Sequence, residues 1–171
     1  AFAVVLGIPT LQLRGDYLAI VTIAAAEIVR LLLLSTTWIE TTGSADGLVA
    51  YANDFRDINP FPNGDYGFGP WSYAANQFWV LLFGLVVLAL SALLIWRLVN
   101  SPWGRVIKGI REDEDAVRSL GKNVFAYKMQ ALVVGGVIAG LGGALYVLPS
   151  SANPMLFATS LTFFVWTALL L

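Results

Sequence analysis

The sequence contains no cysteine and no histidine among its 171 residues. The lack of cysteine excludes disulfide bonds, thiolate metal sites and a cysteine nucleophile. The lack of histidine excludes a Ser-His-Asp triad, an HExxH zinc site and an imidazole proton relay. No other set of residues resembles a catalytic constellation, so we do not expect an enzyme.

Charged residues are also scarce, at 12% of the chain, whereas hydrophobic residues make up 58%. A soluble domain carries about 25% charged residues, and the mean hydropathy of +0.75 likewise disfavours a soluble protein. Ten Lys and Arg residues stand against eleven Asp and Glu residues, which excludes a nucleic-acid partner bound through bulk positive charge. The composition predicts an integral membrane protein that is surrounded by lipid.

Long apolar stretches predict an all-α fold, a polytopic bundle of transmembrane helices, because one span needs about 20 apolar residues. No charged residue follows Lys128, and the sequence PSSANP (149–154) predicts a turn within this last uncharged stretch. Both ends of the chain lie inside apolar stretches, so we expect an internal part of a longer membrane protein, without a signal peptide. The predicted spans are about 1–10 (partial), 16–34, 76–97, 129–148 and 156–171 (partial).

The positions of the basic residues predict the orientation of these spans. Seven of the ten cations lie within 97–128, whereas Arg56 is the one cation within 35–77, where five acidic residues accompany it. Because Lys and Arg accumulate in cytoplasmic loops, we expect a cytoplasmic loop at 98–128 and an outer loop at 35–75.

The cytoplasmic segment 101–128 carries the most informative pattern. Its apolar residues fall on one helical face at 106–110 and again at 117–120, and the charged run REDED (111–115) separates them. This interruption predicts two short helices with a bend, the second beginning with acidic residues and ending at Gly121. Such a segment either docks into a groove of a partner or forms a solvated charged loop.

The same segment resembles the cytoplasmic coupling loop of the permease subunits of branched-chain amino-acid ABC importers. Two further stretches resemble the same family, namely LQLRGDYLAIVT (11–22) with EIVR (27–30), and TGSADGL (42–48). Gly109 departs from the family's usual Ala, which we expect to loosen the first short helix by up to about 1 kcal/mol. The matching residues of the loop are Gly104, Arg105, Ile110, Arg111, Glu112, Asp113, Glu114, Ala116, Leu120, Gly121, Tyr127 and Lys128.

The resemblance implies a multi-pass subunit of a bacterial or archaeal inner membrane that forms a translocation pathway. It also implies two separate ABC ATP-binding subunits, a homologous second permease subunit, and a periplasmic or extracellular substrate-binding protein docked on the outer segment 37–77. The chain has no GxxxxGK[ST] phosphate loop, so ATP is expected to bind the partner subunits, and no cofactor is expected here. The residues implied in coupling to the ATPase are Arg105, Arg111, Glu112, Asp113, Glu114, Val117, Leu120 and Gly121.

Glu27 and Arg30 are the charges inside a predicted span, and their i, i+3 spacing allows them to pair. Charged residues inside a membrane are costly and often functional, so Glu27 is a candidate for the substrate pathway, although structural pairing is favoured. Thr22, a small polar residue in the same helix, is a second pathway candidate.

Small residues recur at helical spacing in the span 129–148, at Gly135, Gly136, Gly140 and Gly143. Such residues let two membrane helices approach closely, either inside the bundle or between two copies of the chain.

Two other functions stay open, namely an ATP-independent secondary transporter or channel subunit and an assembly subunit. The residues do not decide whether the cargo is leucine-like, another amino acid, urea or an amide.

Overall fold

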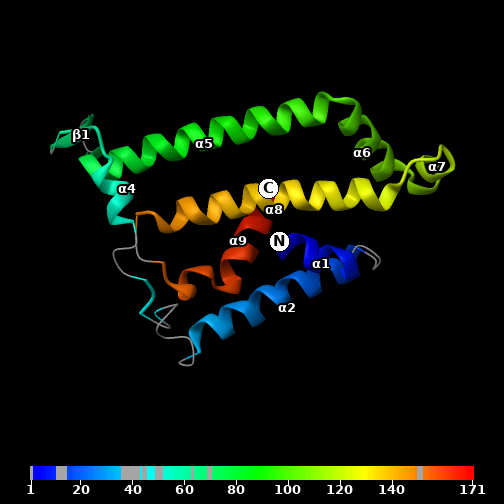
Figure 1. Cartoon of the computed structure of the whole chain (residues 1–171), viewed down its shortest axis with the longest axis horizontal. Coiled ribbons are helices and arrows are strands. Elements are labelled where there is room, and N and C mark those ends of the chain that lie inside the picture. The colour runs from blue at the N-terminus through cyan, green and yellow to red at the C-terminus, as the bar shows by residue number, and fades with distance from the viewer. Residues whose placement is uncertain are drawn as a thin grey trace.

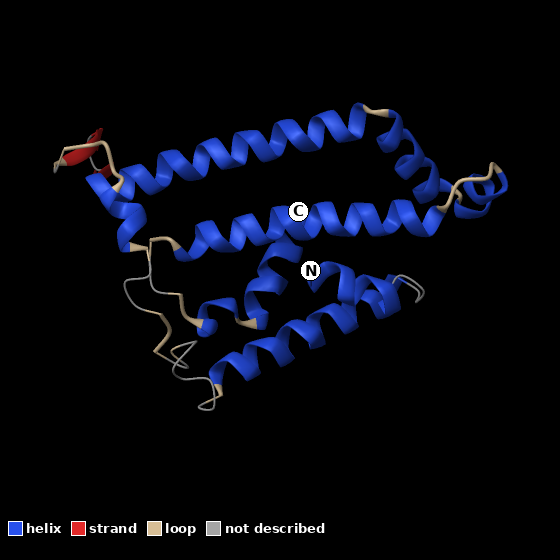
Figure 2. Cartoon of the chain, in the orientation of Figure 1, coloured by secondary structure: helices blue, strands red, loops and turns tan. Residues whose placement is uncertain are grey.

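A computed structural model describes residues 2–10, 15–35, 43, 46–48, 52–62, 64–68, 71–149 and 152–171. The described chain consists mainly of helices, which confirms the helical fold class (Figure 2). Two of them, α5 (Ala75–Asn100) and α8 (Val124–Val147), are long and apolar enough to cross a membrane. At 1.5 Å per residue they are about 39 and 36 Å long, which exceeds the hydrocarbon thickness of about 30 Å.

Helices α5 and α8 lie antiparallel, and three other helices accompany them on the side of α8 (Figure 1). Helix α1 (Phe2–Thr10) lies between α8 and α2 (Gly15–Leu34) and contacts both of them. Helix α9 (Thr159–Leu170) follows the 3₁₀ helix η2 (Pro154–Phe157), which contacts α2. The motif 11–14, including Arg14, lies outside the described residues.

Two short helices connect α5 to α8 at one end of the molecule, on the right of Figure 1. Helix α6 spans Pro102–Glu112 and helix α7 spans Glu114–Ser119. Asp113 separates them with an extended backbone (φ −151°, ψ 104°). The sequence predicted two short helices with a bend at this charged run, and the structure confirms the bend.

Helix α8 begins five residues before the predicted span, at Val124, because Asn123 caps it. The side chain of Asn123 accepts a hydrogen bond of 3.1 Å from the backbone N–H of Ala126. The first turns of α8 therefore belong to the segment that carries α6 and α7.

The opposite end of the molecule contains structure that the sequence pattern did not predict. A short helix α4 (Asn53–Asp57) precedes an antiparallel hairpin of β1 (Asp65–Phe68) and β2 (Trp71–Ala74). Aromatic rings join this hairpin to α5: Phe61 packs edge-on against both Tyr66 and Phe78, at centroid distances of 5.6 and 5.4 Å. The rings cover the start of α5 at this end.

A backbone bridge at this end joins the segment after α2 to the segment before η2. Leu48 and Ala152 exchange two backbone hydrogen bonds of 3.0 and 3.3 Å. Gly47 adopts φ +70°, and a Cβ there would lie 2.5 Å from the carbonyl oxygen of Ala152. Only glycine fits this position, although other residues of the motif at 42–48 (42, 44 and 45) lie outside the described residues.

Few side chains of the described chain are fully buried, and many large apolar side chains on the long helices are exposed. On α5, for example, Leu88 and Trp96 are exposed. Apolar helix surfaces of this extent are stable in contact with lipid or with other membrane helices.

Candidate functional site

The candidate site has two parts, the helical segment α6–α7 and an apolar cavity between α1, α2 and α8. The segment starts at a sharp turn after α5, where the side chain of Ser101 accepts a hydrogen bond from the backbone N–H of Gly104. Pro102 occupies the first turn of α6, where its missing N–H costs nothing. A Cβ on Gly104 would lie 2.2 Å from the carbonyl oxygen of Val99, so the turn requires glycine.

Helix α7 is short but has a cap at each end. The side chain of Asp113 accepts hydrogen bonds of 3.0 Å from the backbone N–H groups of Asp115 and Ala116, which makes Asp113 an N-cap. Gly121 follows the helix with φ +75°, the left-handed conformation that commonly terminates helices. The residue pattern predicted acidic residues at the start of this helix and an end at Gly121, and the structure confirms both; it also identifies Asp113 as the residue that caps the start.

Ion pairs hold α7 together and join it to α8. Arg118 donates to Asp115 at 2.9 Å and to Glu114 at 3.0 Å within the helix. Glu114 also accepts a hydrogen bond of 2.5 Å from the Nζ of Lys128, which lies in α8. The carboxylate of Glu114 is therefore shared between a contact inside α7 and a contact to a long membrane helix.

Val117 of α7 and Leu120, the C-cap of this helix, have different environments. Val117 is buried, and its Cγ2 lies 3.1 Å from where a Cβ would stand on Gly109, so the glycine lets α6 and α7 pack closely. Leu120 is 77% exposed. Of the two expected apolar anchors, Val117 packs inside the segment and Leu120 faces outward.

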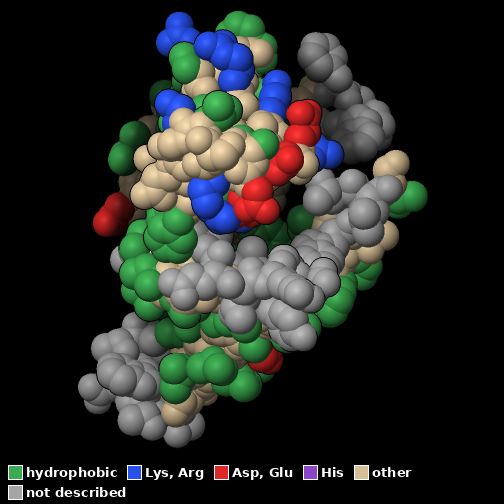
Figure 3. Space-filling model, turned by 90° about the vertical axis from the view of Figure 1, so that its right-hand side faces the viewer, with side chains coloured by type: hydrophobic (Ala, Val, Ile, Leu, Met, Phe, Trp, Pro, Cys, Tyr) green, Lys and Arg blue, Asp and Glu red, His purple; other side chains and the backbone are tan. Residues whose placement is uncertain are grey.

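The remaining charged candidates form the exposed surface of the segment. Arg105, Arg111 and Glu112 are exposed and make no ion pair with any described residue. In Figure 3, Lys, Arg, Asp and Glu side chains gather over the half of this face that α6 and α7 occupy, and most of the described side chains in the other half are hydrophobic. The end of the molecule therefore presents both signs of charge beside an exposed leucine.

A second contact ties α6 to α8. The indole N–H of Trp103 donates a hydrogen bond of 2.8 Å to the Oε1 of Gln130. Neither residue was among the sequence candidates for coupling, because a Trp near a membrane boundary is expected as an interfacial anchor. The pairing of Trp103 with Gln130 depends on how α6 folds back against α8.

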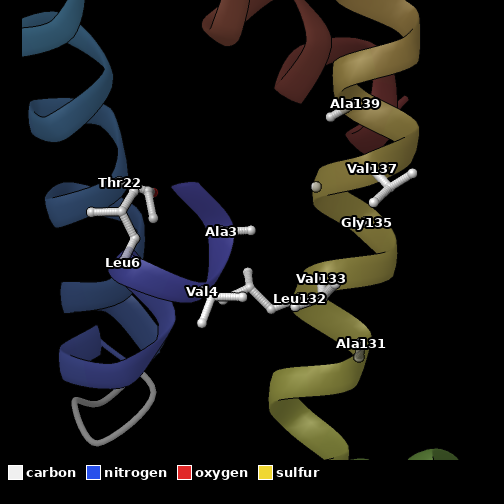
Figure 4. A pocket seen from close by; sticks show the side chains of 11 residues that line it. Ala3, Val4, Leu6, Thr22, Ala131, Leu132, Val133, Gly135, Val137 and Ala139 are labelled. Atoms are coloured by element: carbon white, nitrogen blue, oxygen red, sulfur yellow. The ribbon is translucent and has the colours of Figure 1, made fainter. Parts of the chain in front are cut away.

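The cavity has a volume of about 580 Å³ and is lined mainly by apolar side chains (Figure 4). Thr22 of α2 lies on one side, beside Leu6 of α1, and Gly135 of α8 lies on the other. The Thr22 hydroxyl donates a hydrogen bond of 2.9 Å to the carbonyl oxygen of Ala19, so its hydrogen is already used within α2. The structure places Thr22 and Gly135 in one cavity, whereas Glu27 does not line it.

The four glycines predicted to pack helices fall into two groups. A Cβ on Gly136 would lie 2.8 Å from the Cβ of Ala3 in α1, and one on Gly143 would lie 3.6 Å from the ring of Phe157. Gly135 and Gly140 have no described atom within 4 Å of the same position. Gly136 thus sets the spacing of α1 and α8, and Gly135 and Gly140 leave open space.

Glu27 and Arg30 form the predicted pair within α2. The Nε of Arg30 donates to the Oε2 of Glu27 at 2.9 Å, and a second contact joins Nη2 to Oε1. Thr159, at the start of α9, also donates to Oε2 of Glu27 at 3.0 Å. The pair therefore also connects two helices that lie far apart in the sequence.

Comparison with known proteins places the chain in a family. The family model described as the permease component of the branched-chain amino acid transport system matches residues 1–171. The chain belongs to this family. It is 38% identical over 152 residues to the high-affinity branched-chain amino acid transport system permease protein LivM of Salmonella typhimurium. It is 31% identical over 141 residues to a probable branched-chain amino acid transport permease protein LivM of Methanocaldococcus jannaschii.

These matches cover 82% of this chain but 35% of the Salmonella protein and 36% of the Methanocaldococcus protein. The permease chain therefore spans about a third of the length of the curated relatives it matches. A shorter match, 30% identical over 70 residues, covers 41% of the chain and 22% of the nucleoside ABC transporter permease protein NupC of Lactococcus lactis. No solved structure matches the chain.

Family membership identifies the chain as part of a prokaryotic membrane permease component. The resemblance found from the sequence motifs is confirmed. Sequence reasoning missed Gln130, Thr159 and Gly7 of the permease chain. Gly7 could have been recognised as a helix-packing residue, because it is a small residue in an apolar helix. A Cβ at this position would lie 2.7 Å from the side chain of Leu132. No sequence signal linked Gln130 or Thr159 to its partner.

Proposed function

We propose that this permease chain forms part of the membrane pathway of an ATP-driven importer of branched-chain or related amino acids. In this proposal α6 and α7 dock on one of two separate ABC ATP-binding subunits in the cytoplasm. The docking surface consists of Arg105, Arg111, Glu112 and Leu120. The observation that carries the proposal is the capped α7, which presents Leu120 at 77% exposure beside exposed charges of both signs.

The arrangement of the described helices supports the proposed orientation. The α6–α7 segment and the hairpin β1–β2 lie at opposite ends of the long helices α5 and α8 (Figure 1). Because basic residues concentrate at the α6–α7 end, this end is cytoplasmic and the hairpin end is outside. The outer end, within 37–77, is then the docking surface for a substrate-binding protein, and a homologous second permease completes the pathway.

The cavity between α1, α2 and α8 supports an apolar cargo. Its lining is mainly aliphatic, and Thr22 contributes a hydroxyl. A branched-chain side chain fits such a lining, because apolar side chains bind favourably to apolar walls. The Salmonella and Methanocaldococcus relatives are named for branched-chain amino acids, whereas the relative from Lactococcus is named for nucleosides.

The docking proposal is tested by purifying the full-length parent with its partner subunits and measuring ATP-dependent leucine uptake in proteoliposomes. Leu120→Asp and Glu112→Arg should each reduce co-purification of the ATP-binding subunits and lower uptake. Lys122→Glu is the matched control, because Lys122 is exposed in the same segment, just after α7, but lies outside the proposed docking surface. An equal loss of co-purification and uptake in the control variant would contradict the proposed docking surface.

The energy source separates this proposal from a secondary transporter. Uptake that requires ATP and a substrate-binding protein supports the importer. Uptake that follows an ion gradient without any ATP-binding subunit overturns it, and would make Glu27 and Arg30 the next residues to examine. A failure to transport any solute would favour an assembly subunit.

A further inference from the structure

Glu114 differs from the other acidic candidates in the α6–α7 segment because both of its carboxylate oxygens are occupied. Oε1 accepts a hydrogen bond of 3.0 Å from Arg118, and Oε2 accepts one of 2.5 Å from Lys128. The side chain is 38% exposed, whereas neighbouring Glu112 is exposed and makes no ion pair within the described chain. The carboxylate of Glu114 is thus paired within this chain, whereas the exposed carboxylate of Glu112 can bind a residue of a partner subunit.

Lys128 connects this contact to the proposed pathway. It lies in the second turn of α8, three residues before Ala131, where the lining of the cavity begins. Three residues of α-helix correspond to about 4.5 Å along the axis. A displacement of α7 that is transmitted through Lys128 therefore reaches the cavity wall through less than one helical turn.

A second contact joins the same part of α8 to α6. Trp103 donates to Gln130 at 2.8 Å, two residues beyond Lys128. Val117 packs against Gly109, so α6 and α7 are also attached to each other. Side-chain hydrogen bonds and ion pairs connect both short helices to α8, whereas the hydrogen bonds found between described residues of α6 and α5 belong to the connecting turn around Ser101.

We propose that the Glu114–Lys128 pair holds α7 rigidly against α8, so that movement of α7 is passed to the cavity wall at Ala131 and beyond. Glu114 is in this view a positioning residue for transport and not a contact to the ATP-binding subunit. This inference rests on the proposed function of α6–α7 as the docking segment. In this proposal, the Glu114–Lys128 ion pair and helix α8 transmit the movement of α7 to the cavity wall.

The chemistry of the pair fits a positioning role. Lys128 is 33% exposed and Glu114 is 38% exposed, and ion pairs in such partly solvated positions add little to folding stability. They do fix the relative position of two helices when the carboxylate is oriented by a second donor. Arg118 supplies that second donor and is itself held by Asp115.

The test is a charge-swap series in the full-length transporter, reconstituted with its partner subunits in proteoliposomes. Glu114→Lys and Lys128→Glu should each lower ATP-dependent uptake by about fivefold or more, the size of a typical coupling between two sites. Both variants should retain the ATP-binding subunits on purification and should still hydrolyse ATP. The double variant Glu114→Lys/Lys128→Glu should recover most of the uptake, because Arg118 keeps Asp115 as a partner.

Lys122→Glu serves as the matched control for Lys128→Glu and should leave uptake close to that of the parent, since Lys122 is exposed and makes no ion pair with any described residue. The proposal is overturned if the double variant is as defective as the two single changes combined. It is also overturned if Glu114→Lys releases the ATP-binding subunits, because Glu114 would then belong to the docking surface.

A cross-linking experiment tests the same link without relying on charge. The chain has no cysteine, so Glu114→Cys and Lys128→Cys can be introduced into a parent whose other cysteines are replaced by serine. Uptake should fall in the reduced double variant and recover when a flexible bis-thiosulfonate reagent joins the two thiols. Complete cross-linking without recovery overturns the proposal.

The outcome also distinguishes this inference from the proposed function. If Leu120→Asp and Glu112→Arg disrupt docking while the charge swap gives no rescue, α6–α7 is the docking segment but the link runs elsewhere. If neither set of variants affects docking or ATP-dependent uptake, the proposed function itself fails.

Discussion

Thr159 donates a hydrogen bond of 3.0 Å to the carboxylate of Glu27, across 132 positions of sequence. The contact joins the start of α9 to the fourth turn of α2, beside the Glu27–Arg30 ion pair. The N-cap position of α9, Ala158, provides no side-chain cap. A carboxylate near the first turn of α9 also favours that helix end electrostatically.

We expect Glu27→Gln to lower the thermal stability of the full-length permease in lipid or detergent. The change removes the negative partner of Arg30, and an unpaired cation inside a membrane is costly. Thr159→Val should lower the melting temperature less, because it removes one hydrogen bond and leaves the ion pair in place.

The control for this prediction removes both charges. Glu27→Gln/Arg30→Met should be more stable than Glu27→Gln alone, because no unpaired cation is left. If the double variant is the less stable of the two, Arg30 has another partner in the assembled protein. Melting temperatures from intrinsic tryptophan fluorescence provide the comparison.

The second prediction concerns the spacing of α1 and α8. Gly136→Ala places a methyl group where Ala3 stands 2.8 Å away, so one of the two helices must shift. Overpacking of this kind costs about 1–3 kcal/mol. Ala3→Gly in the Gly136→Ala background should restore part of the stability.

Gly140→Ala is the matched control because no described atom lies within 4 Å of the added methyl group. Its better helix propensity should stabilise the protein by up to about 1 kcal/mol. Denaturant unfolding in mixed micelles measures both changes. Equal effects of the two substitutions would show that Gly136 does not set the contact with α1.

The third prediction separates capping by Asp113 from contact with a partner. Asp113→Ala should destabilise α7 by about 1 kcal/mol, because the N–H groups of Asp115 and Ala116 lose their acceptor. Asp113→Asn retains a capping oxygen without the charge. We expect it to keep both the helix and the uptake activity close to those of the parent.

Amide hydrogen exchange over peptides that contain Asp115 and Ala116 measures the cap directly. Exchange should accelerate in Asp113→Ala and stay close to that of the parent in Asp113→Asn. If Asp113→Asn keeps its protection but loses uptake, the charge of Asp113 contacts an ATP-binding subunit, and its role is more than a helix cap.

The local structure of the α6–α7 segment could be predicted because its signals are short-range. Capping by Asp113, termination at Gly121 and the break between two apolar patches all depend on residues within one or two helical turns. The pairing of Glu27 with Arg30 was predictable for the same reason, since the two residues are one turn apart. Only the bounds of the elements differed, as at the start of α8.

Contacts between distant segments could not be predicted in this way. The hairpin β1–β2 lay in a stretch that matched no pattern, although its aromatic residues on both sides of a Gly-Pro pair were a signal for strands. The bridge between Leu48 and Ala152 and the link between Trp103 and Gln130 carry no signal in either segment alone. Each of these contacts forms only because the fold brings the ends of two helices, or the segments that follow them, close together.

Hydropathy, the placement of basic residues and the coupling-loop motif were sufficient to recognise a helical membrane permease. These properties are sums over local residues, and solvation by lipid or water acts on each segment separately. The tertiary structure decided which of several similar charged residues form ion pairs within the chain and which stay exposed to a partner. Glu112 and Glu114 are near neighbours of the same type, yet the fold brings Lys128 to Glu114 because α8 returns beside α7.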